Sequence, residues 1–423
     1  MKMIKRNTFY IKKIRQIFLF FIFINITTFC TGLTDEHYEQ NSIFIPIEVI
    51  TPGIVYVDDG FNETTPGWGY DHFDCIQEGI NAVDINGSVY TYDGVYYEHV
   101  IVNKQLFLIG LQNNENLPII DGSLSGSPLT IDANNAVIES VIVRNAGNEA
   151  DWDNSGIIIA NNRRNNTILN SYIHGICYVG IFFQHTTENT LIQNNSIQDT
   201  TKGIYVFKGD KVNLSNNIIM STYHALTIEE SKNCIINSNT ITSSIFGIHA
   251  EMNGINNRII GNNISNNERT GMTIWRAIEG QIIIENNNVE RNNVGIKVDD
   301  NTVPVTISNN YIYSNTADFK EDAGLIVSYN DNCIIEHNQF ENNEPFGIHL
   351  LASFNCSVNE NNFLGNDALF SSSYFSHFSN NYWDRKRVFP KIIFGKIGVF
   401  YLIPIIMLDW HPAQKPYEIG RIR

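Results

Sequence analysis

The residues best suited to chemistry recur at a fixed spacing through the middle of the chain. A small residue followed by an aliphatic one marks each repeat, as in Gly203-Ile204, Ala225-Leu226, Gly247-Ile248, Gly271-Met272 and Gly295-Ile296. Side chains alternate between the faces of a strand, so an inward aliphatic residue places the second and fourth residues after the small one outward. These places predict one outward face that carries Tyr205, Phe207, Glu229, His249, Glu251, Trp275, Lys297 and Asp299, with Arg276 and Asp300 just beyond.

Two kinds of chemistry fit these residue types. Aromatic rings stack on sugars and carboxylates accept hydrogen bonds from hydroxyls, so the face is suited to carbohydrate binding by Tyr205, Phe207, His249, Trp275, Arg276 and Lys297. Stacked strands lie about 4.8 Å apart, which predicts about 5 Å between Glu229 and Glu251 and about 10 Å between Glu251 and Asp299. Such separations serve glycoside hydrolysis, and like charges so close raise one pKa. Glu229, Glu251 and Asp299 are the catalytic candidates, although an acidic outer surface also carries such residues without any ligand.

The repeat itself predicts the fold. The small-aliphatic marker recurs at steps of 22 to 24 residues, with one step of 29, from Gly156 to Gly347. A nine-residue phrase keeps the same register, as in Asn189-Thr-Leu-Ile-Gln-Asn-Asn-Ser-Ile197, with Asn usual at its seventh place. Short alternating runs indicate strands, and Asn suits sharp turns and stacked hydrogen-bond ladders. We therefore expect an all-β parallel β-helix of about ten rungs rather than a Leu-dominated repeat with helices.

Composition excludes several classes of protein. Among 423 residues there are 44 acids and 28 Lys and Arg, a net charge of −16, and 57 Asn. An all-α fold would be richer in strong helix formers. Nucleic acid is not an expected partner because no basic stripe appears. No zinc, phosphate-loop or catalytic-triad spacing occurs, and His residues do not cluster with Met or Cys, so no cofactor is predicted and neither copper nor calcium is supported.

The expected domain order begins with an export segment. Residues 1–32 combine basic residues with a short apolar run and predict a signal peptide or an uncleaved anchor. A linker (33–53), an N-terminal cap with first rungs (54–125), the repeats (126–383) and a C-terminal cap (384–423) follow. We expect a monomer that is secreted or held at the cell surface and that touches a membrane only through an uncleaved N-terminal segment.

Three further features leave alternatives open. Asp71 is expected to cap a helix with Phe73, Ile76, Ile80 and Val83 on one face, covering the first rung. Residues 392–408 are apolar but are interrupted by Lys396 and Pro404, which favours a packed cap over a membrane helix. Cys333 and Cys356 fall on adjacent rungs, either as stacked thiols or as a disulfide.

Several phrases resemble a known family. Tyr56-Val-Asp-Asp59, Gly94-Val-Tyr96 and Pro118-Ile-Ile-Asp-Gly122 look like the N-terminal part of pectin-lyase-like, right-handed parallel β-helix proteins. The rungs and Asn380-Asn-Tyr-Trp383 resemble the NosD-type repeats, also grouped as periplasmic copper-binding or as carbohydrate-binding and sugar-hydrolase domains. With Asp409-Trp-His-Pro-Ala413, the chain is similar to secreted archaeal members of that group. The resemblance implies the fold and does not specify an activity, since the motifs of polygalacturonases and pectate lyases are not assembled.

Three functions are compatible with these observations. The first is a non-enzymatic exported module that binds a polysaccharide or a cell-surface glycan along the middle rungs. The second is a polysaccharide lyase, epimerase or hydrolase acting at the same face. The third is a purely structural envelope protein.

Overall fold

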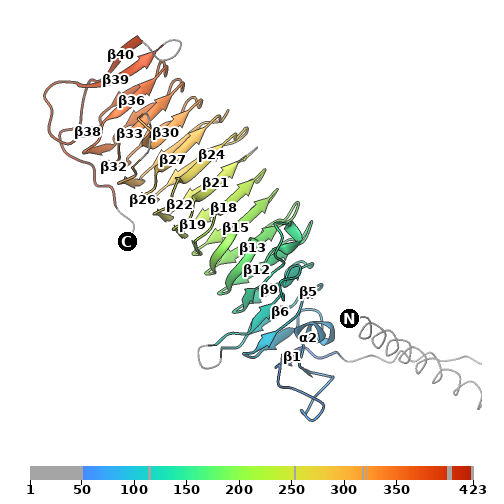
Figure 1. Ribbon diagram of the computed structural model, residues 1–423. Helices are drawn as coiled ribbons and strands as arrows, with labels where there is room; N and C mark the ends of the chain where they lie inside the picture. Colours follow the sequence, from blue (N-terminus) through green and yellow to red (C-terminus); the bar gives the residue numbers. More distant parts are fainter. Residues whose placement is uncertain are drawn as a thin grey trace, which may run out of the picture. The chain divides into compact units, whose positions relative to one another are not determined.

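Each repeat folds into short strands that turn around a common core and stack on the equivalent strands of the next repeat (Figure 1). The computed structural model describes residues 51–112, 116–251, 254–316, 319–320, 322–397 and 403–420. The expected signal peptide or anchor (1–32) and most of the expected linker (33–53) lie outside these residues. The described part is a parallel β-helix of about 13 turns. The expectation of about ten rungs was too low because strands before the first marker, and strands after Gly347, also form turns.

The strands that the structure describes form one sheet of 15 strands and one of 25 strands. The first sheet contains β1 (Ile54–Val57), β2 (His72–Phe73), β3 (Ser88–Thr91), β6 (Phe107–Gly110), β9 (Val137–Glu139), β12 (Thr167–Leu169), β14 (Leu191–Gln193), β16 (Asn213–Ser215), β19 (Ile235–Asn237), β22 (Arg258–Ile260), β25 (Ile282–Glu285), β28 (Val305–Ser308), β31 (Ile334–Glu336), β34 (Ser357–Asn359) and β37 (His377–Ser379).

The second sheet has two limbs, which the long strands β13 (Tyr172–Phe183) and β15 (Ser196–Phe207) join. One limb adds β4 (Val95–Tyr96), β7 (Ile119–Asp121), β10 (Ile142–Arg144), β17 (Ile218–Met220), β20 (Thr240–Thr242), β23 (Asn263–Ser265), β26 (Asn288–Glu290), β29 (Tyr311–Tyr313), β32 (Gln339–Glu341), β35 (Asn362–Leu364) and β38 (Tyr382–Trp383). The other limb adds β5 (Val100–Val102), β8 (Leu129–Ile131), β11 (Ile157–Ile159), β18 (His224–Glu229), β21 (Phe246–Glu251), β24 (Thr270–Trp275), β27 (Val294–Asp299), β30 (Ala323–Ser328), β33 (Phe346–Leu351), β36 (Ala368–Ser371), β39 (Lys391–Ile397) and β40 (Ile403–Asp409).

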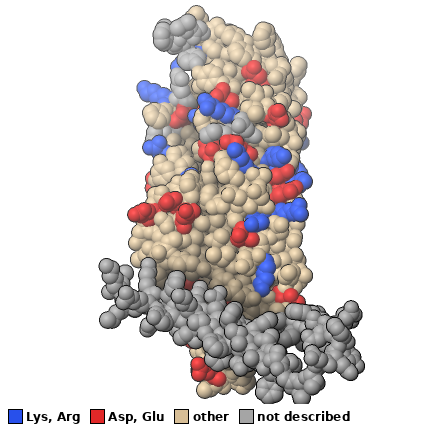
Figure 2. Space-filling view, turned by 90° about the vertical axis from the view of Figure 1, so that its right-hand side faces the viewer, with Lys and Arg blue, Asp and Glu red and all other residues tan. Residues whose placement is uncertain are grey.

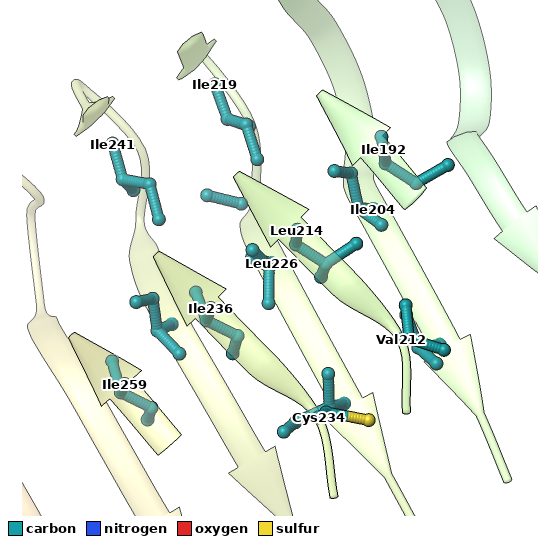
Figure 3. Packing of buried hydrophobic residues seen from close by; sticks show 14 of the residues in the cluster. Ile192, Ile204, Val212, Leu214, Ile219, Leu226, Cys234, Ile236, Ile241 and Ile259 are labelled. Carbon is teal, nitrogen blue, oxygen red and sulfur yellow. The ribbon is translucent and has the colours of Figure 1, made fainter. Parts of the chain in front are cut away.

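The core consists of aliphatic columns that run along the solenoid. Ile192, Leu214, Ile236 and Ile259 are Cα partners on successive turns and are fully buried (Figure 3). Because each inward side chain packs on its counterpart in the next turn, the alternating pattern of the sequence becomes a continuous core. Cys333 and Cys356 occupy such core places as free, buried thiols, which agrees with the stacked-thiol alternative.

Asparagine has two separate structural roles in the nine-residue phrase. At the seventh place, where Asn follows Asn on successive turns, the buried Asn accepts hydrogen bonds from the backbone and side-chain amides of the preceding Asn, as Asn262 does from Asn239 at 2.9 and 3.0 Å. This ladder confirms the predicted stacking. At the sixth place, residues such as Asn194 and Asn286 adopt a positive φ and make the turn.

The N-terminal cap differs in one detail from the expectation. Helix α2 (Ile76–Ala82) forms and buries Ile76 and Ile80, but Asp71 does not cap it. The Glu98 carboxylate accepts hydrogen bonds from the backbone N–H groups of Ile76 at 2.8 Å and Gln77 at 2.9 Å. The capping group therefore comes from a later segment, whereas sequence rules expect the capping side chain directly before the helix.

At the other end of the solenoid, the described residues of the apolar stretch, 392–397 and 403–408, lie in the antiparallel strands β39 and β40 rather than in a membrane helix. In the part of the chain that the structure describes, no helix is long and apolar enough to span a membrane. Figure 2 shows Lys and Arg interspersed with Asp and Glu on one face of the molecule, most of which carries neither type.

Candidate functional site

The register of the middle strands confirms the two outward columns. One column consists of the Cα partners Tyr205, Thr227, His249, Thr273 and Lys297, and the other of Phe207, Glu229, Glu251, Trp275 and Asp299. These residues come from β15, β18, β21, β24 and β27, so the predicted residues lie in two adjacent rows of one limb. Side-chain contacts then divide them into two groups.

The first group is built around an aromatic cluster of Trp152, Tyr178, Phe182, Tyr205 and Phe207. Trp152 belongs to the 3-10 helix η1 (Trp152–Asn154), and its indole stacks on Phe182 with ring centroids 4.7 Å apart and on Tyr205 at 4.9 Å. Tyr205 is consequently only 6% exposed, although it points outward from the solenoid. The cluster therefore forms a packed aromatic wall on the outer surface.

A pocket of about 390 Å³ lies against this wall. It is lined by Trp152, Asn161, Phe182, Gln184, His185, Tyr205, Phe207 and Glu229. Flat rings beside amide, imidazole and carboxylate groups match the alternating apolar faces and hydroxyl edges of a sugar. Of the predicted residues, Tyr205, Phe207 and Glu229 line this pocket.

Polar and charged groups adjoin the aromatic wall. The Lys202 Nζ lies 4.1 Å from the Tyr205 ring centroid and 5.0 Å from that of Trp152. The Tyr205 phenol donates a hydrogen bond to the Glu229 carboxylate. On the next turn, the His249 Nε2 lies 3.6 Å from a carboxylate oxygen of Glu251.

His224 completes this polar group. Its ring stacks on Phe246 at 4.8 Å and on His249 at 5.5 Å between centroids. The buried Nδ1 of His224 has no hydrogen-bond partner among the described residues. We call Lys202, Tyr205, His224, Glu229, His249 and Glu251 the proton-transfer group.

Burial sets the protonation of this group. Burial lowers the pKa of His224 to about 4, helped by the neighbouring His249 and Lys202, and burial beside Lys202 also lowers the pKa of His249. Both imidazoles are therefore neutral at pH 7 and able to accept a proton.

The pKa values of Tyr205 and Glu251 are raised, whereas that of Lys202 is lowered like those of the two histidines. Burial and the hydrogen bond to Glu229 raise the pKa of Tyr205, which stays a phenol that can donate a proton. Burial and the nearby Glu229 raise the pKa of Glu251, while Lys202 opposes that shift. Burial lowers the pKa of Lys202, against the attraction of Glu229 and Glu251. At pH 7 these neighbouring turns therefore carry unprotonated imidazoles and a protonated phenol, the forms in which such groups accept and donate a proton.

The second group surrounds Trp275, and its charged side chains form ion pairs with one another. The Arg276 guanidinium lies 4.3 Å from the Trp275 ring centroid and binds Asp300 at 3.1 Å. Asp299 accepts a hydrogen bond from the Ser328 hydroxyl at 2.5 Å and pairs with Lys297 at 3.2 Å. Trp275 lies between Glu251 and Asp299 in the register, so the structure does not bring Asp299 to the Glu229 pocket.

Trp152, Lys202 and His224 lie at this site although the outward columns of the repeat do not include them. Lys202 and His224 each precede a marker residue and are Cα partners, so a column drawn one place before the marker would have found them. That place lies two residues before the inward aliphatic residue, so strict alternation predicts that its side chain also points inward. Trp152 lies in a segment without the repeat, where an aromatic residue beside acids is the only sequence signal.

The described side chains form no metal-binding cluster. Within the described ranges, no three or more His, Cys, Asp or Glu side chains are grouped so that they could hold a metal ion. His249 and Glu251 are close to each other, but Asp299, the third ligand that their spacing would require, is bound to Lys297.

Comparisons with known proteins agree with this geometry at the level of the fold. A family model described as right handed beta helix region matches residues 119–264, 180–318 and 256–382. The A-module of mannuronan C-5 epimerase AlgE6 from Azotobacter vinelandii is similar with a TM-score of 0.60 and 16% identity, over 72% of this chain and 93% of that chain. The AlgE4 A-module from the same organism gives a TM-score of 0.49 and 15% identity, over 78% and 91%. The search of curated proteins found no match. The narrower resemblance to NosD-type and archaeal proteins stays a prediction.

Proposed function

The chain belongs to the right-handed beta helix family, and we propose that it is a carbohydrate-active enzyme that transfers protons on an acidic polysaccharide, as a lyase or an epimerase. The single observation that carries this proposal is the proton-transfer group beside the aromatic pocket. Neutral His249 lies near Glu251, and the protonated Tyr205 is bound to Glu229. The solved AlgE6 module, which is named as an epimerase, supports the same class of chemistry only through its fold.

The proposed reaction starts at the sugar carbon next to a carboxylate. The His249 imidazole takes the proton from this carbon, and the Glu251 carboxylate, 3.6 Å from its Nε2, attracts the imidazolium that forms. The Lys202 ammonium offsets the negative charge that spreads onto the sugar carboxylate. These roles make His249 the base and Lys202 the charge-stabilising residue.

The Tyr205 phenol then supplies a proton. If it protonates the glycosidic oxygen, the carbon–oxygen bond breaks and a carbon–carbon double bond forms, which is elimination. If it protonates the same carbon from the opposite face, the sugar is epimerised and the chain stays intact. In both cases the proton lost by Tyr205 is replaced from the protonated His249 through solvent, so the group returns to its starting state.

A second candidate function is carbohydrate binding without turnover. The observation that favours it is the aromatic wall itself, because stacked rings beside a pocket of about 390 Å³ bind a sugar without needing any catalyst. This candidate keeps the roles of Trp152 and Phe182 and assigns none to His249.

To test this proposal, the full chain is incubated with polyuronates and with neutral polysaccharides, and both the products and the retained protein are measured. Unsaturated ends indicate elimination, a changed ratio of epimers in NMR spectra indicates epimerisation, and retention without either product indicates binding only. Tyr205→Phe should abolish the product while leaving retention. The matched control is Tyr311→Phe, because the Tyr311 phenol also donates to a glutamate, Glu341, at 2.7 Å on another limb. Equal activity in both variants would contradict the enzyme proposal.

A further inference from the structure

Positive charge is concentrated at one end of this acidic protein. Residues 384–397 contain five Lys and Arg and one Asp, whereas residues 51–103 contain nine Asp and Glu and no Lys or Arg. Arg385 and Lys386 are exposed, while Lys391 is bound to Asp367. The two ends of the solenoid therefore differ in the sign of their charge.

Apolar side chains are exposed beside these cations. Phe394 is 69% exposed, and Ile406, its Cα partner across the hairpin, is 52% exposed. Val388 and Phe389 precede the hairpin and are also largely exposed. Phe394 and Ile406 belong to β39 and β40, which Figure 1 shows at one end of the solenoid, and Val388 and Phe389 come shortly before β39 in the chain. We call residues 384–397 and 403–410 the C-terminal arm.

The rest of the protein covers only part of this arm. The inward face of β39 packs through Ile393, and Gly395 lies against the Phe370 ring. The four consecutive residues from Ile403 to Ile406 are all exposed, so both faces of β40 are open there. Among the described strands, β40 pairs only with β39. A two-stranded ribbon with apolar residues on both faces is unusual for a surface that contacts only water.

We propose that the C-terminal arm docks on an anionic lipid bilayer. Phe394, Ile406 and neighbouring apolar side chains enter the headgroup region, and Arg385 and Lys386 meet lipid phosphates. Charge complementarity favours this partner, since a symmetric contact with a second copy would bring two sets of cations together. Pro404 also removes one backbone donor from the edge strand, which disfavours strand pairing with another chain.

The experiment measures flotation of the full chain with vesicles of phosphatidylcholine alone and with added phosphatidylglycerol. The apolar N-terminal stretch is present in every variant, so only differences between variants report on the arm. Arg385→Ser with Lys386→Ser should weaken binding to anionic vesicles about fivefold for each charge removed. Phe394→Ser with Ile406→Ser should also reduce binding severalfold.

The matched control is Phe319→Ser with Ile85→Ser, which removes two exposed apolar side chains away from the arm and should leave binding unchanged. Equal binding of wild type to both vesicle types, or full binding by the arm variants, would overturn the proposal. Light scattering without vesicles tests the competing partner: a dimer that only the arm variants abolish would assign the arm to a second copy. Unfolding midpoints show whether each variant is folded.

Discussion

The buried carboxylate of Asp409 takes the place that the next asparagine would hold after Asn381. It accepts hydrogen bonds from the Asn381 backbone N–H at 3.0 Å and from the Asn381 side-chain amide at 3.2 Å. The indole N–H of Trp383 donates to the same oxygen at 3.0 Å. The asparagine ladder therefore ends on a residue of the terminal hairpin, which ties β40 to the body of the solenoid.

Replacing Asp409 with alanine should destabilise the protein. Three buried donors would lose their acceptor, so we expect Asp409→Ala to lower the free energy of unfolding by about 3 kcal/mol. Denaturant unfolding measures this change. Asp300→Ala is the control, because Asp300 is exposed and its ion pair with Arg276 should contribute less than about 0.5 kcal/mol. Equal stability of the two variants would mean that Asp409 does not hold the cap.

The two asparagine roles predict that substitutions at adjacent positions change stability by different amounts. Asn287 is buried and accepts from Asn262 at 2.9 and 3.0 Å, so Asn287→Ala should cost about 2–3 kcal/mol. Asn286 has a φ of 56°, which glycine adopts freely, so Asn286→Gly should change stability by less than about 1 kcal/mol. Thermal or denaturant unfolding of both variants is the measurement. Similar losses at the two positions would contradict the assigned roles.

The repeat made the core and the outward columns predictable. A period-two pattern that recurs every 22 to 24 residues fixes which side chains face inward and which stack, and the register of Glu229, Glu251 and Trp275 follows from it. Tertiary contacts made the remainder unpredictable. Glu98 caps a helix more than 20 residues before it, and η1 folds Trp152 over Tyr205 from outside the repeat. Neither contact leaves a periodic signal in the sequence.

Acid should destabilise the folded protein through His224. Its pKa is about 4 when folded and about 6.5 in an unfolded chain, so between these values the unfolded state binds a proton that the folded state does not. The stabilising contribution is complete above about pH 6.5 and is lost as the pH falls towards 4. Partial solvent contact limits the loss to the order of 2 kcal/mol.

The measurement is the free energy of unfolding at pH 7 and at pH 5. His224→Phe keeps a ring against Phe246 and should flatten the difference between the two pH values. Glu251, whose pKa is raised, contributes with the opposite sign, and His249, whose pKa is lowered, contributes with the same sign. Both residues are present in both proteins, so the difference between the two proteins reports on His224. The same pH dependence in wild type and variant would show that His224 is not the group responsible.

Substitution of two tryptophans, one in each group, shows which group binds the ligand. Trp152 lines the pocket and covers Tyr205, whereas Trp275 lies in the second group against Arg276. Loss of one stacking ring costs about 1.5–3 kcal/mol, so Trp152→Ala should weaken oligosaccharide binding roughly tenfold to a hundredfold, and Trp275→Ala should change it little. Calorimetric titration of both variants gives the affinities. A loss confined to Trp275→Ala would move the site to the second group, where Trp275 lies two turns and Asp299 three turns beyond Glu229, and would separate it from the proton-transfer group.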